Sequence, residues 1–241
     1  MARRTYNQFC GLSRSLDIVG ERWTLLIVRE FMSGPKRYTD LADVLRGVGT
    51  TLLATRIRQL EQDGIVVRRT LPPPAASQVY ELTPVGHELA QALVPLAIWG
   101  IRHQLGGTRL PGETYRAEWT LVFLAELIDA GPSAGRHATY QFRIDESAAQ
   151  LHVHDQKVTV VPGEAADGAD ATLTGDFATV VELALGGLDT ASALASGRIT
   201  ADGDPAALEL LLKLLEPVLP ARSVVTGEPG RRDLNATADS P

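Results

Sequence analysis

The sequence lacks the features that secreted and membrane-spanning proteins need. Its 241 residues include one cysteine, Cys10, which can form no internal disulfide and cannot complete a zinc site by itself. Apolar runs such as residues 24–28 are far too short to span a bilayer. The N-terminus starts with basic residues, but Asn7, Gln8 and Asp17 stand where a signal peptide would need an apolar core. We therefore expect a cytoplasmic protein that folds by hydrophobic burial and has no contact with a membrane.

Residue patterns typical of enzymes are also missing from the sequence. There is no Ser/His/Asp order, no glycine-rich loop for phosphate and no triad of metal ligands. His152 and His154 are two residues apart and would share one face of a strand, but two ligands without a third rarely hold a metal. Histidines that face solvent are the favoured interpretation. We therefore predict a protein that is not an enzyme and uses no cofactor and no metal.

The charge is divided unevenly along the chain. The net charge is −6, yet residues 1–105 hold 13 Lys and Arg against 9 Asp and Glu, whereas residues 106–241 hold 10 against 20. A Gly/Pro cluster at 106–112 interrupts helical periodicity between the two parts. We predict a basic domain at 1–105, a linker at 106–115, an acidic domain at 116–220 and a flexible tail at 221–241. Only the first domain would lie against phosphate.

The first domain shows a recognisable order of elements. Apolar residues at spacings of three and four predict one helix from Leu12 to Met32, and Thr39 is placed to cap a short second helix. A third helix is expected at 50–62, followed by a hairpin of strands 65–70 and 78–82 with a stiff Pro-rich tip. Thr83 and Pro84 then begin a long apolar helix. This order is that of a winged helix-turn-helix, whose third helix fits the major groove of DNA.

Several motifs in this domain are specific enough to indicate a family. They are Cys10, the segments 16–30 and 34–38, the segment 56–61 with Gly64, and the segment 80–83 with Gly86. Over about residues 6–105 the chain resembles the HxlR-type regulators, winged-helix proteins related to the MarR type. The resemblance implies a homodimer, built by the N-terminal helix and the long helix after the wing, on a pseudo-palindromic operator in double-stranded DNA.

Carried over to this sequence, the resemblance places DNA contacts at two helices and the wing. The candidate residues are Lys36, Arg37, Thr50, Thr51, Thr55, Arg58, Arg68 and Arg69. For Arg58 alone, an ordinary solvated helix face is an equal alternative. The third helix begins with threonines instead of Arg or Asn, the usual bidentate readers of bases, so DNA shape is expected to contribute to recognition.

Cys10 has two interpretations. Some members of the family use a cysteine near this position as an oxidant sensor, and a thiol close to a helix N-terminus can have a lowered pKa. A single cysteine is more often a small buried apolar residue. If Cys10 is redox-active, its only disulfide partners are another chain or a small thiol.

The acidic domain combines helices with alternating strands. Helices are expected at 116–128, 177–185 and 205–216, and alternating apolar residues predict strands around 140–144, 151–154, 158–161 and 171–173. The stretch 139–218 resembles the sterol-carrier-protein fold, an α+β lipid-binding module, on segments 150–155, 157–160, 169–173 and 194–204. The predicted fold class is α+β, with a winged helix-turn-helix followed by a sterol-carrier-like sheet with helices.

The second resemblance implies a site for an apolar small molecule between sheet and helices, although a closed core would bury the same side chains. The candidate ligand-binding residues are Phe142, Leu151, Leu173, Phe177, Val180, Leu183, Leu211 and Leu215. The leading hypothesis is a dimeric regulator whose acidic domain senses an apolar effector and changes operator affinity. The alternative is a purely structural C-terminal domain, with DNA binding controlled by oxidation of Cys10 or not controlled at all.

Overall fold

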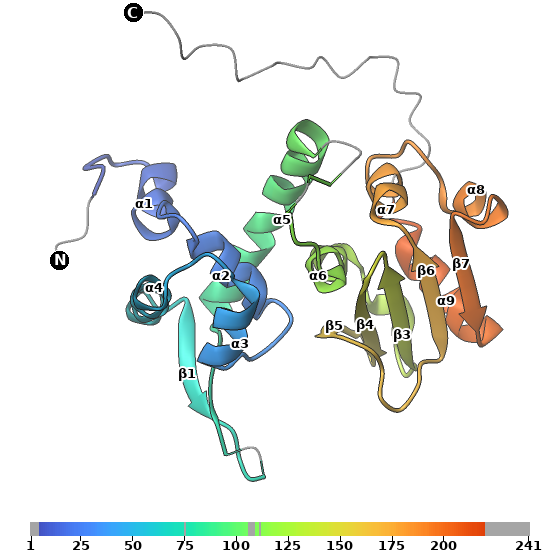
Figure 1. The fold of residues 1–241 in the computed structure, drawn as a ribbon, viewed down its shortest axis with the longest axis horizontal. Helices are drawn as coiled ribbons and strands as arrows, with labels where there is room; N and C mark the ends of the chain where they lie inside the picture. The colour runs from blue at the N-terminus through green and yellow to red at the C-terminus, as the bar shows by residue number, and fades with distance from the viewer. Residues whose placement is uncertain (1–4, 75, 106–108, 111, 220–241) are drawn as a thin grey trace, which may run out of the picture.

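The computed structural model describes residues 5–74, 76–105, 109–110 and 112–219, which form two domains around two hydrophobic cores (Figure 1). The predicted tail at 221–241 lies outside the described residues, as do residues 106–108 and 111 of the predicted linker. The N-terminal domain contains α1 (Gly11–Val19), α2 (Thr24–Phe31), α3 (Tyr38–Val44), α4 (Thr50–Gln62), β1 (Val66–Thr70), β2 (Gln78–Leu82) and α5 (Pro84–Gln104). The C-terminal domain contains α6 (Ala117–Leu127), β3 (His137–Ile144), β4 (Ser147–His154), β5 (Lys157–Pro162), β6 (Ala171–Gly175), α7 (Phe177–Ala184), α8 (Thr190–Ala195), β7 (Ile199–Gly203) and α9 (Pro205–Leu215).

The prediction of a single helix from Leu12 to Met32 is wrong, because two helices stand there. The first ends at Val19, and Trp23, just before the second, has a left-handed backbone with φ of 79°. That conformation cannot continue a right-handed helix. The apolar periodicity continues across the break, so the pattern alone could not reveal it.

The short second helix starts two residues earlier than expected. Arg37, not Thr39, precedes its first turn, and the backbone N–H of Arg37 donates to Oδ2 of Asp40 at 2.8 Å. This reciprocal bond from the third helical residue satisfies an N–H that would otherwise lack a partner. Helix α4 has the bounds that its pattern predicts, with Leu53, Ile57 and Leu60 buried.

The wing is an antiparallel hairpin that projects from the N-terminal domain (Figure 1). Its register pairs Val66 with Leu82 and Thr70 with Gln78. Lys36 forms a further bridge to Tyr80, with the Lys36 N–H donating to the Tyr80 carbonyl at 2.9 Å. Helix α5 begins as predicted, because Thr83 Oγ1 accepts from the Gly86 N–H and proline occupies the first turn.

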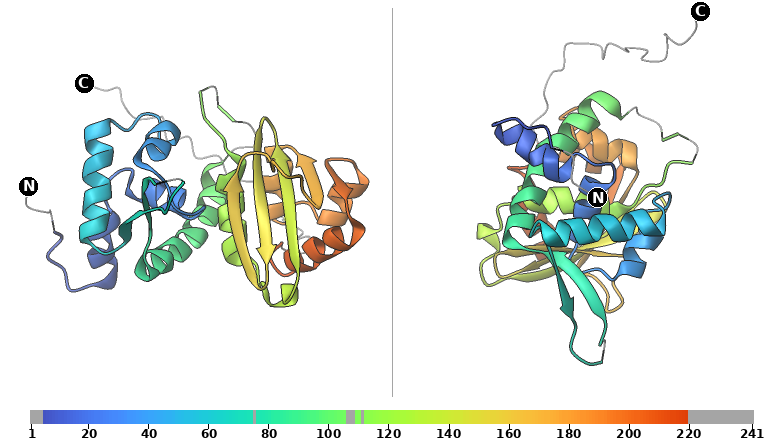
Figure 2. Two further views of the ribbon diagram at one scale, coloured as in Figure 1. Left: turned by 90° about the horizontal axis from the view of Figure 1, so that it is seen from below. Right: turned by 90° about the vertical axis from the view of Figure 1, so that its left-hand side faces the viewer.

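The C-terminal domain is built on a five-stranded sheet with strand order β5-β4-β3-β6-β7. Only the β3 and β6 pair is parallel among the four described pairings. One sheet face is apolar, as predicted, and α6 packs over β4 and β5 on it (Figure 2). The segment 194–204, which contributed to the resemblance, contains the end of α8 and the strand β7. Neither was expected as a separate element.

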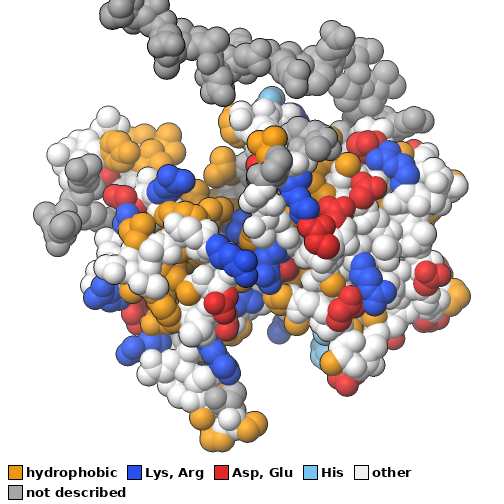
Figure 3. Space-filling view, viewed as in Figure 1, with side chains coloured by type: hydrophobic (Ala, Val, Ile, Leu, Met, Phe, Trp, Pro, Cys, Tyr) orange, Lys and Arg blue, Asp and Glu red, His pale blue; other side chains and the backbone are white. Residues whose placement is uncertain are grey.

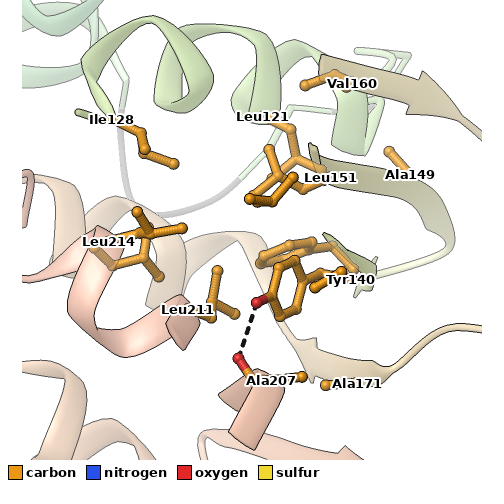
Figure 4. Close-up of a cluster of buried hydrophobic side chains, with 14 of the residues drawn as sticks. Leu121, Ile128, Tyr140, Ala149, Leu151, Val160, Ala171, Ala207, Leu211 and Leu214 are labelled. Carbon is orange, nitrogen blue, oxygen red and sulfur yellow. Dashed lines mark hydrogen bonds between the residues drawn. The ribbon is translucent and has the colours of Figure 1, made fainter. Parts of the chain in front are cut away.

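The core of this domain lies between the apolar sheet face and the helices (Figure 4). Tyr140 of β3 is fully buried, and its hydroxyl donates to the Ala207 carbonyl of α9 at 2.9 Å. Burial raises the pKa of Tyr140 to about 12, so the hydroxyl stays a donor. Leu121 of α6 and Leu151 of β4 are equally buried in this layer. The helices are therefore fixed to the sheet by packing and by hydrogen bonds such as that between Tyr140 and Ala207.

The two domains meet along α6. Met32, just after α2, and Phe123 of α6 each pack against both cores. The Arg29 guanidinium lies 3.9 Å from the ring centre of Trp119 and forms a 2.6 Å ion pair with Glu30, which is buried. A cation held against an aromatic face adds to the apolar contact. Nothing in the sequence pattern predicted this junction.

No helix in the part of the chain that the structure describes is long and apolar enough to cross a membrane.

Candidate nucleic-acid interface

The exposed face of α4 carries the candidate groove residues. Thr50, Thr51 and Arg58 are exposed, opposite the buried stripe of the helix. The Tyr38 hydroxyl donates to the Thr50 carbonyl at 2.8 Å and ties the start of α4 to α3. The helix is therefore held rigidly while its polar side chains face solvent.

Two of the candidates on α4 are bonded along their own helix. The Thr55 hydroxyl donates to the Thr51 carbonyl at 2.8 Å, and Arg58 Nε donates to the Ala54 carbonyl at 3.2 Å. Such local bonds of Ser, Thr and Arg on a helix surface are weak and compete with other partners. Both side chains thus lie on the outward side of α4. A change of rotamer would allow each of them to donate to an acceptor outside the protein instead.

The wing supplies two arginines in different states. Arg68 is exposed and has no ion-pair partner among the described residues, whereas Arg69 Nε pairs with Glu81 Oε1 across the hairpin at 2.8 Å. The Arg69 side chain is still 66% exposed. An exposed pair of this kind contributes little and yields readily to another anion. Both wing arginines are therefore accessible. In the right-hand view of Figure 2, α4 runs across the face turned toward the viewer and the hairpin extends beneath it.

Lys36 and Arg37, adjacent in sequence, are placed differently. Arg37 is exposed at the start of α3. Lys36 is partly buried near the domain junction, and desolvation lowers the pKa of its ammonium, while the carboxylates Glu30 and Glu118 partly offset that shift. The structure therefore brings Arg37 to the exposed surface with α4 and the wing, and directs Lys36 toward the other domain.

Sequence reasoning missed Arg46. It is exposed in the turn between α3 and α4, and its Nε donates to the Asp43 carbonyl at 3.3 Å. The signal was present in the sequence, because an arginine beside the Gly47 and Gly49 turn of a helix-turn-helix lies next to the recognition helix. The α4 N-terminus adds backbone N–H groups, since Gly49 has no side chain to cap them.

Cys10 is exposed just before α1, and this placement differs from a buried apolar role. The backbone N–H groups of Ser13 and Leu12 lower the pKa of its thiol. A lowered pKa raises the thiolate fraction at neutral pH. The residue thus has the accessibility that redox chemistry requires.

The candidate ligand-binding residues lie in or against the C-terminal core. Phe142, Leu151, Leu183, Leu211 and Leu215 are buried, and the others are partly buried around them, namely Leu173, Phe177 and Val180. Most of these side chains therefore share one apolar layer between sheet and helices.

The predicted histidine pair does not gather further ligands. His152 Nε2 bonds Gln150 Oε1 at 2.9 Å, and the His154 ring stacks edgewise on His137 with centres 4.1 Å apart. Within the described ranges, no group of three or more His, Cys, Asp or Glu side chains could hold a metal ion.

Two family models match this chain. The model of the HxlR-like helix-turn-helix matches residues 18–105, and that of the SCP-2 sterol transfer family matches residues 129–216. An HTH-type transcriptional regulator of Synechocystis is 32% identical over 105 residues, which cover 44% of this chain and 73% of that protein. The HTH-type transcriptional regulator YodB of Bacillus subtilis is 31% identical over 94 residues, which cover 39% of this chain and 84% of YodB.

Solved structures include the reduced form of YodB, with 30% identity, coverage of 39% of this chain and 94% of that chain, and a TM-score of 0.36. Another structure is described as quinone-bound YodB, with 28% identity, coverage of 37% and 93%, and a TM-score of 0.33. The curated relatives are transcriptional regulators, which are not enzymes, and this agrees with the non-enzymatic prediction. The chain belongs to the HxlR-like helix-turn-helix family of transcriptional regulators and carries in addition a C-terminal domain of the SCP-2 type.

Proposed function

We propose that the protein is a cytoplasmic, homodimeric transcriptional regulator that binds a pseudo-palindromic operator in double-stranded DNA. The observation that carries this proposal is the exposure of Thr50 and Thr51 of α4 together with the two wing arginines on a helix-turn-helix fold. In such folds the second helix of the motif enters the major groove, and basic residues beside it contact phosphates.

The groove contacts would come from Thr50, Thr51, Thr55 and Arg58, with phosphate contacts from Arg37, Arg68 and Arg69. Lys36 stays in the set as a candidate of lower accessibility. Figure 3 supports the placement of the DNA contacts on the N-terminal domain, because blue side chains are spread over that domain and red ones gather on the C-terminal domain. The acidic domain would be repelled by phosphate and would remain away from the duplex.

The homodimer is supported by apolar side chains that the single chain leaves uncovered. Leu12 and Leu16 of α1 are 69% and 37% exposed, and Leu96 and Trp99 of α5 are 52% and 53% exposed. Orange side chains over α1 are visible in Figure 3. Exposed apolar patches of this kind mark surfaces that another chain covers. A second copy would bury both helices and set two recognition helices apart by a fixed distance.

An apolar small molecule in the C-terminal domain would modulate DNA binding. Leu121 of α6 lies in the C-terminal core, while Trp119 of the same helix holds Arg29 of α2. A ligand that displaces α6 would therefore move the helix that contacts the DNA-binding domain. The quinone of one YodB structure belongs to that protein, and it makes a small apolar effector a reasonable first choice for titration.

The second candidate mechanism is control by Cys10, and the exposure and lowered pKa of its thiol favour it. Oxidation would link Cys10 to another chain or to a small thiol, and the C-terminal domain would then be structural.

One experiment separates these mechanisms. Operator affinity of the full chain is measured while apolar compounds are titrated, and again after mild oxidation, for the native protein and Cys10→Ser. The effector mechanism predicts a 5- to 150-fold change, the usual range of about 1–3 kcal/mol, in both proteins. A response to oxidation alone, lost in Cys10→Ser, would replace the effector mechanism with the thiol mechanism.

A further inference from the structure

A hollow of about 710 Å³ lies between the two domains, beside α6. One wall comes from the turn after α2, from β2 and from α5, and the other comes from the second half of α6 and the edge strand β5. We call it the junction cleft. Its volume falls in the range of about 300–1,000 Å³ typical of small-molecule sites, which occur preferentially at domain interfaces.

The junction cleft is separate from the apolar layer discussed above. None of the eight candidate ligand-binding residues is among the 19 residues that line it. Phe31 and Leu82 of one domain and Val122, Ile128 and Val160 of the other lie buried behind its surface, and Met32 and Val158 are partly buried apolar side chains of its lining. A bound molecule would therefore contact both domains at once.

The charges of the lining have one sign. Glu81 and Glu126 supply carboxylates, and no lysine or arginine is among the 19 lining residues. Glu126 is exposed, and no hydrogen bond or ion pair joins it to another residue in the described ranges. Glu81 forms an ion pair with Arg69 of the hairpin. The cleft thus combines partly buried apolar side chains with one carboxylate that has no ion-pair partner among the described residues.

We propose that the junction cleft binds an organic monocation with a compact apolar body, of the class of protonated arylalkyl amines. The ammonium pairs with Glu126, and the apolar body covers Met32 and Val158, which are only partly buried. A charge-assisted contact beside apolar surface is stronger than one in open water. An anion of the same shape is repelled by both carboxylates, and a neutral analogue leaves Glu126 without a partner.

The positive charge of the bound ammonium also weakens the pair between Arg69 and Glu81, because Glu81 lines the same cleft. Arg69 is then released from its pair and becomes free to contact phosphate, so occupancy strengthens operator binding. This consequence rests on the proposed function, whereas binding of the cation does not.

Binding is tested by calorimetry on the full chain without DNA. Three compounds share one apolar body and differ in charge at pH 7: 4-phenylbutylamine, 4-phenyl-1-butanol and 4-phenylbutanoate. We expect the amine to bind more tightly than the alcohol, and the carboxylate to bind least. Equal affinity for all three compounds, or tightest binding of the alcohol or the carboxylate, would overturn the proposal.

Variants locate the site. Glu126→Gln is expected to weaken the amine about tenfold, as the loss of about 1.4 kcal/mol from a charge-assisted contact would. Glu209→Gln makes the same change at an exposed position of α9, outside the cleft, and should leave binding of the amine unchanged. Gln91→Lys puts a cation into the lining and should reverse the preference toward the carboxylate. Equal effects of Glu126→Gln and Glu209→Gln would contradict the site.

The effect of the bound amine on Arg69 of the wing is tested by a separate measurement of operator affinity. Operator affinity is measured with and without saturating 4-phenylbutylamine, for the native chain and Arg69→Ala. The amine should raise affinity of the native chain and have no effect on Arg69→Ala. Binding of the amine with no change in operator affinity would remove the link to Arg69, while operator binding itself, and so the proposed function, would stand.

Discussion

At the residue scale, the two wing arginines differ in what DNA must displace. Arg68 has no ion-pair partner in the described part of the chain, while Arg69 must leave Glu81. A phosphate contact by either releases condensed counterions and steepens the salt dependence of binding.

We predict that Arg68→Ala lowers operator affinity about equally across sequences and reduces the slope of log K against log salt by about 0.9. Arg69→Ala should reduce the slope by the same amount but lower the affinity less. The reason is that Arg69 has to leave its ion pair with Glu81 before it can contact phosphate. Titrations at four salt concentrations measure both. Arg136→Ala removes an exposed arginine from the C-terminal domain and serves as the control, with no change of slope expected. An unchanged slope in Arg68→Ala would show that the wing does not touch phosphate.

Cys10 gives the pH-dependent prediction at this scale. Because hydrogen bonds from Ser13 and Leu12 favour the thiolate, the pKa of the thiol lies below its ordinary value. Alkylation by iodoacetamide should therefore reach half its maximal rate at a lower pH than it does for free cysteine. The rate is measured against pH by mass spectrometry, and denatured protein provides the reference. A midpoint equal to that of the denatured chain would contradict the placement of Cys10 before α1.

At the element scale, α6 is the helix that joins the domains. Its Trp119 holds Arg29 of α2, and its Phe123 packs against both cores. An interaction of this kind stabilises the fold and also fixes how the domains are placed.

We predict that Trp119→Ala lowers the free energy of unfolding by about 3 kcal/mol, and that Trp119→Phe, which keeps an aromatic face for Arg29, lowers it by about 1 kcal/mol. Urea unfolding measures both. Leu127→Ala, at a position 44% exposed on the same helix, should cost less than 0.5 kcal/mol, roughly the limit for surface substitutions. A double-mutant cycle with Arg29→Met that gives no coupling would refute the contact.

Local patterns predicted many of the elements, and contacts between distant residues account for what was missed. Helix α4, the hairpin and the cap of α7 at Asp176 follow from periodicity and capping chemistry within a few residues. The break at Trp23 could not be predicted, because a left-handed residue leaves the apolar pattern intact. The environment of Lys36 depends on Glu118, far along the chain, so its burial has no local signal.

The candidate sites also differ in whether local sequence patterns or contacts between distant residues define them. Exposed threonines and arginines on α4 and the wing could be assigned from a single helix face and from the register of one hairpin. The junction cleft could not, since its lining combines residues 31–35 with residues 156 and 158–161. Only the tertiary packing of α6 brings those segments together.

At the scale of the whole molecule, a dimer is the assembly that would cover α1 and α5. We predict that Leu12→Glu together with Trp99→Glu gives a monomer in sedimentation velocity. Operator affinity should fall by about a hundredfold, because the second half-site is then no longer bound intramolecularly. Leu212→Glu, at a position 43% exposed on α9, is the matched control and should stay dimeric. A double variant that remains a dimer would place the interface elsewhere.

We propose that the winged helix-turn-helix reads a two-fold symmetric DNA site. Selection of bound sequences from random duplex DNA by the full chain, followed by footprinting of the selected site, tests this proposal. We expect a pseudo-palindrome whose half-sites are separated by one helical turn, about 34 Å, or a multiple of it. We also expect one dimer per site and loss of the footprint when Arg68 and Arg69 are both alanine. Selection that enriches no symmetric sequence, or a footprint that survives without both arginines, would contradict it.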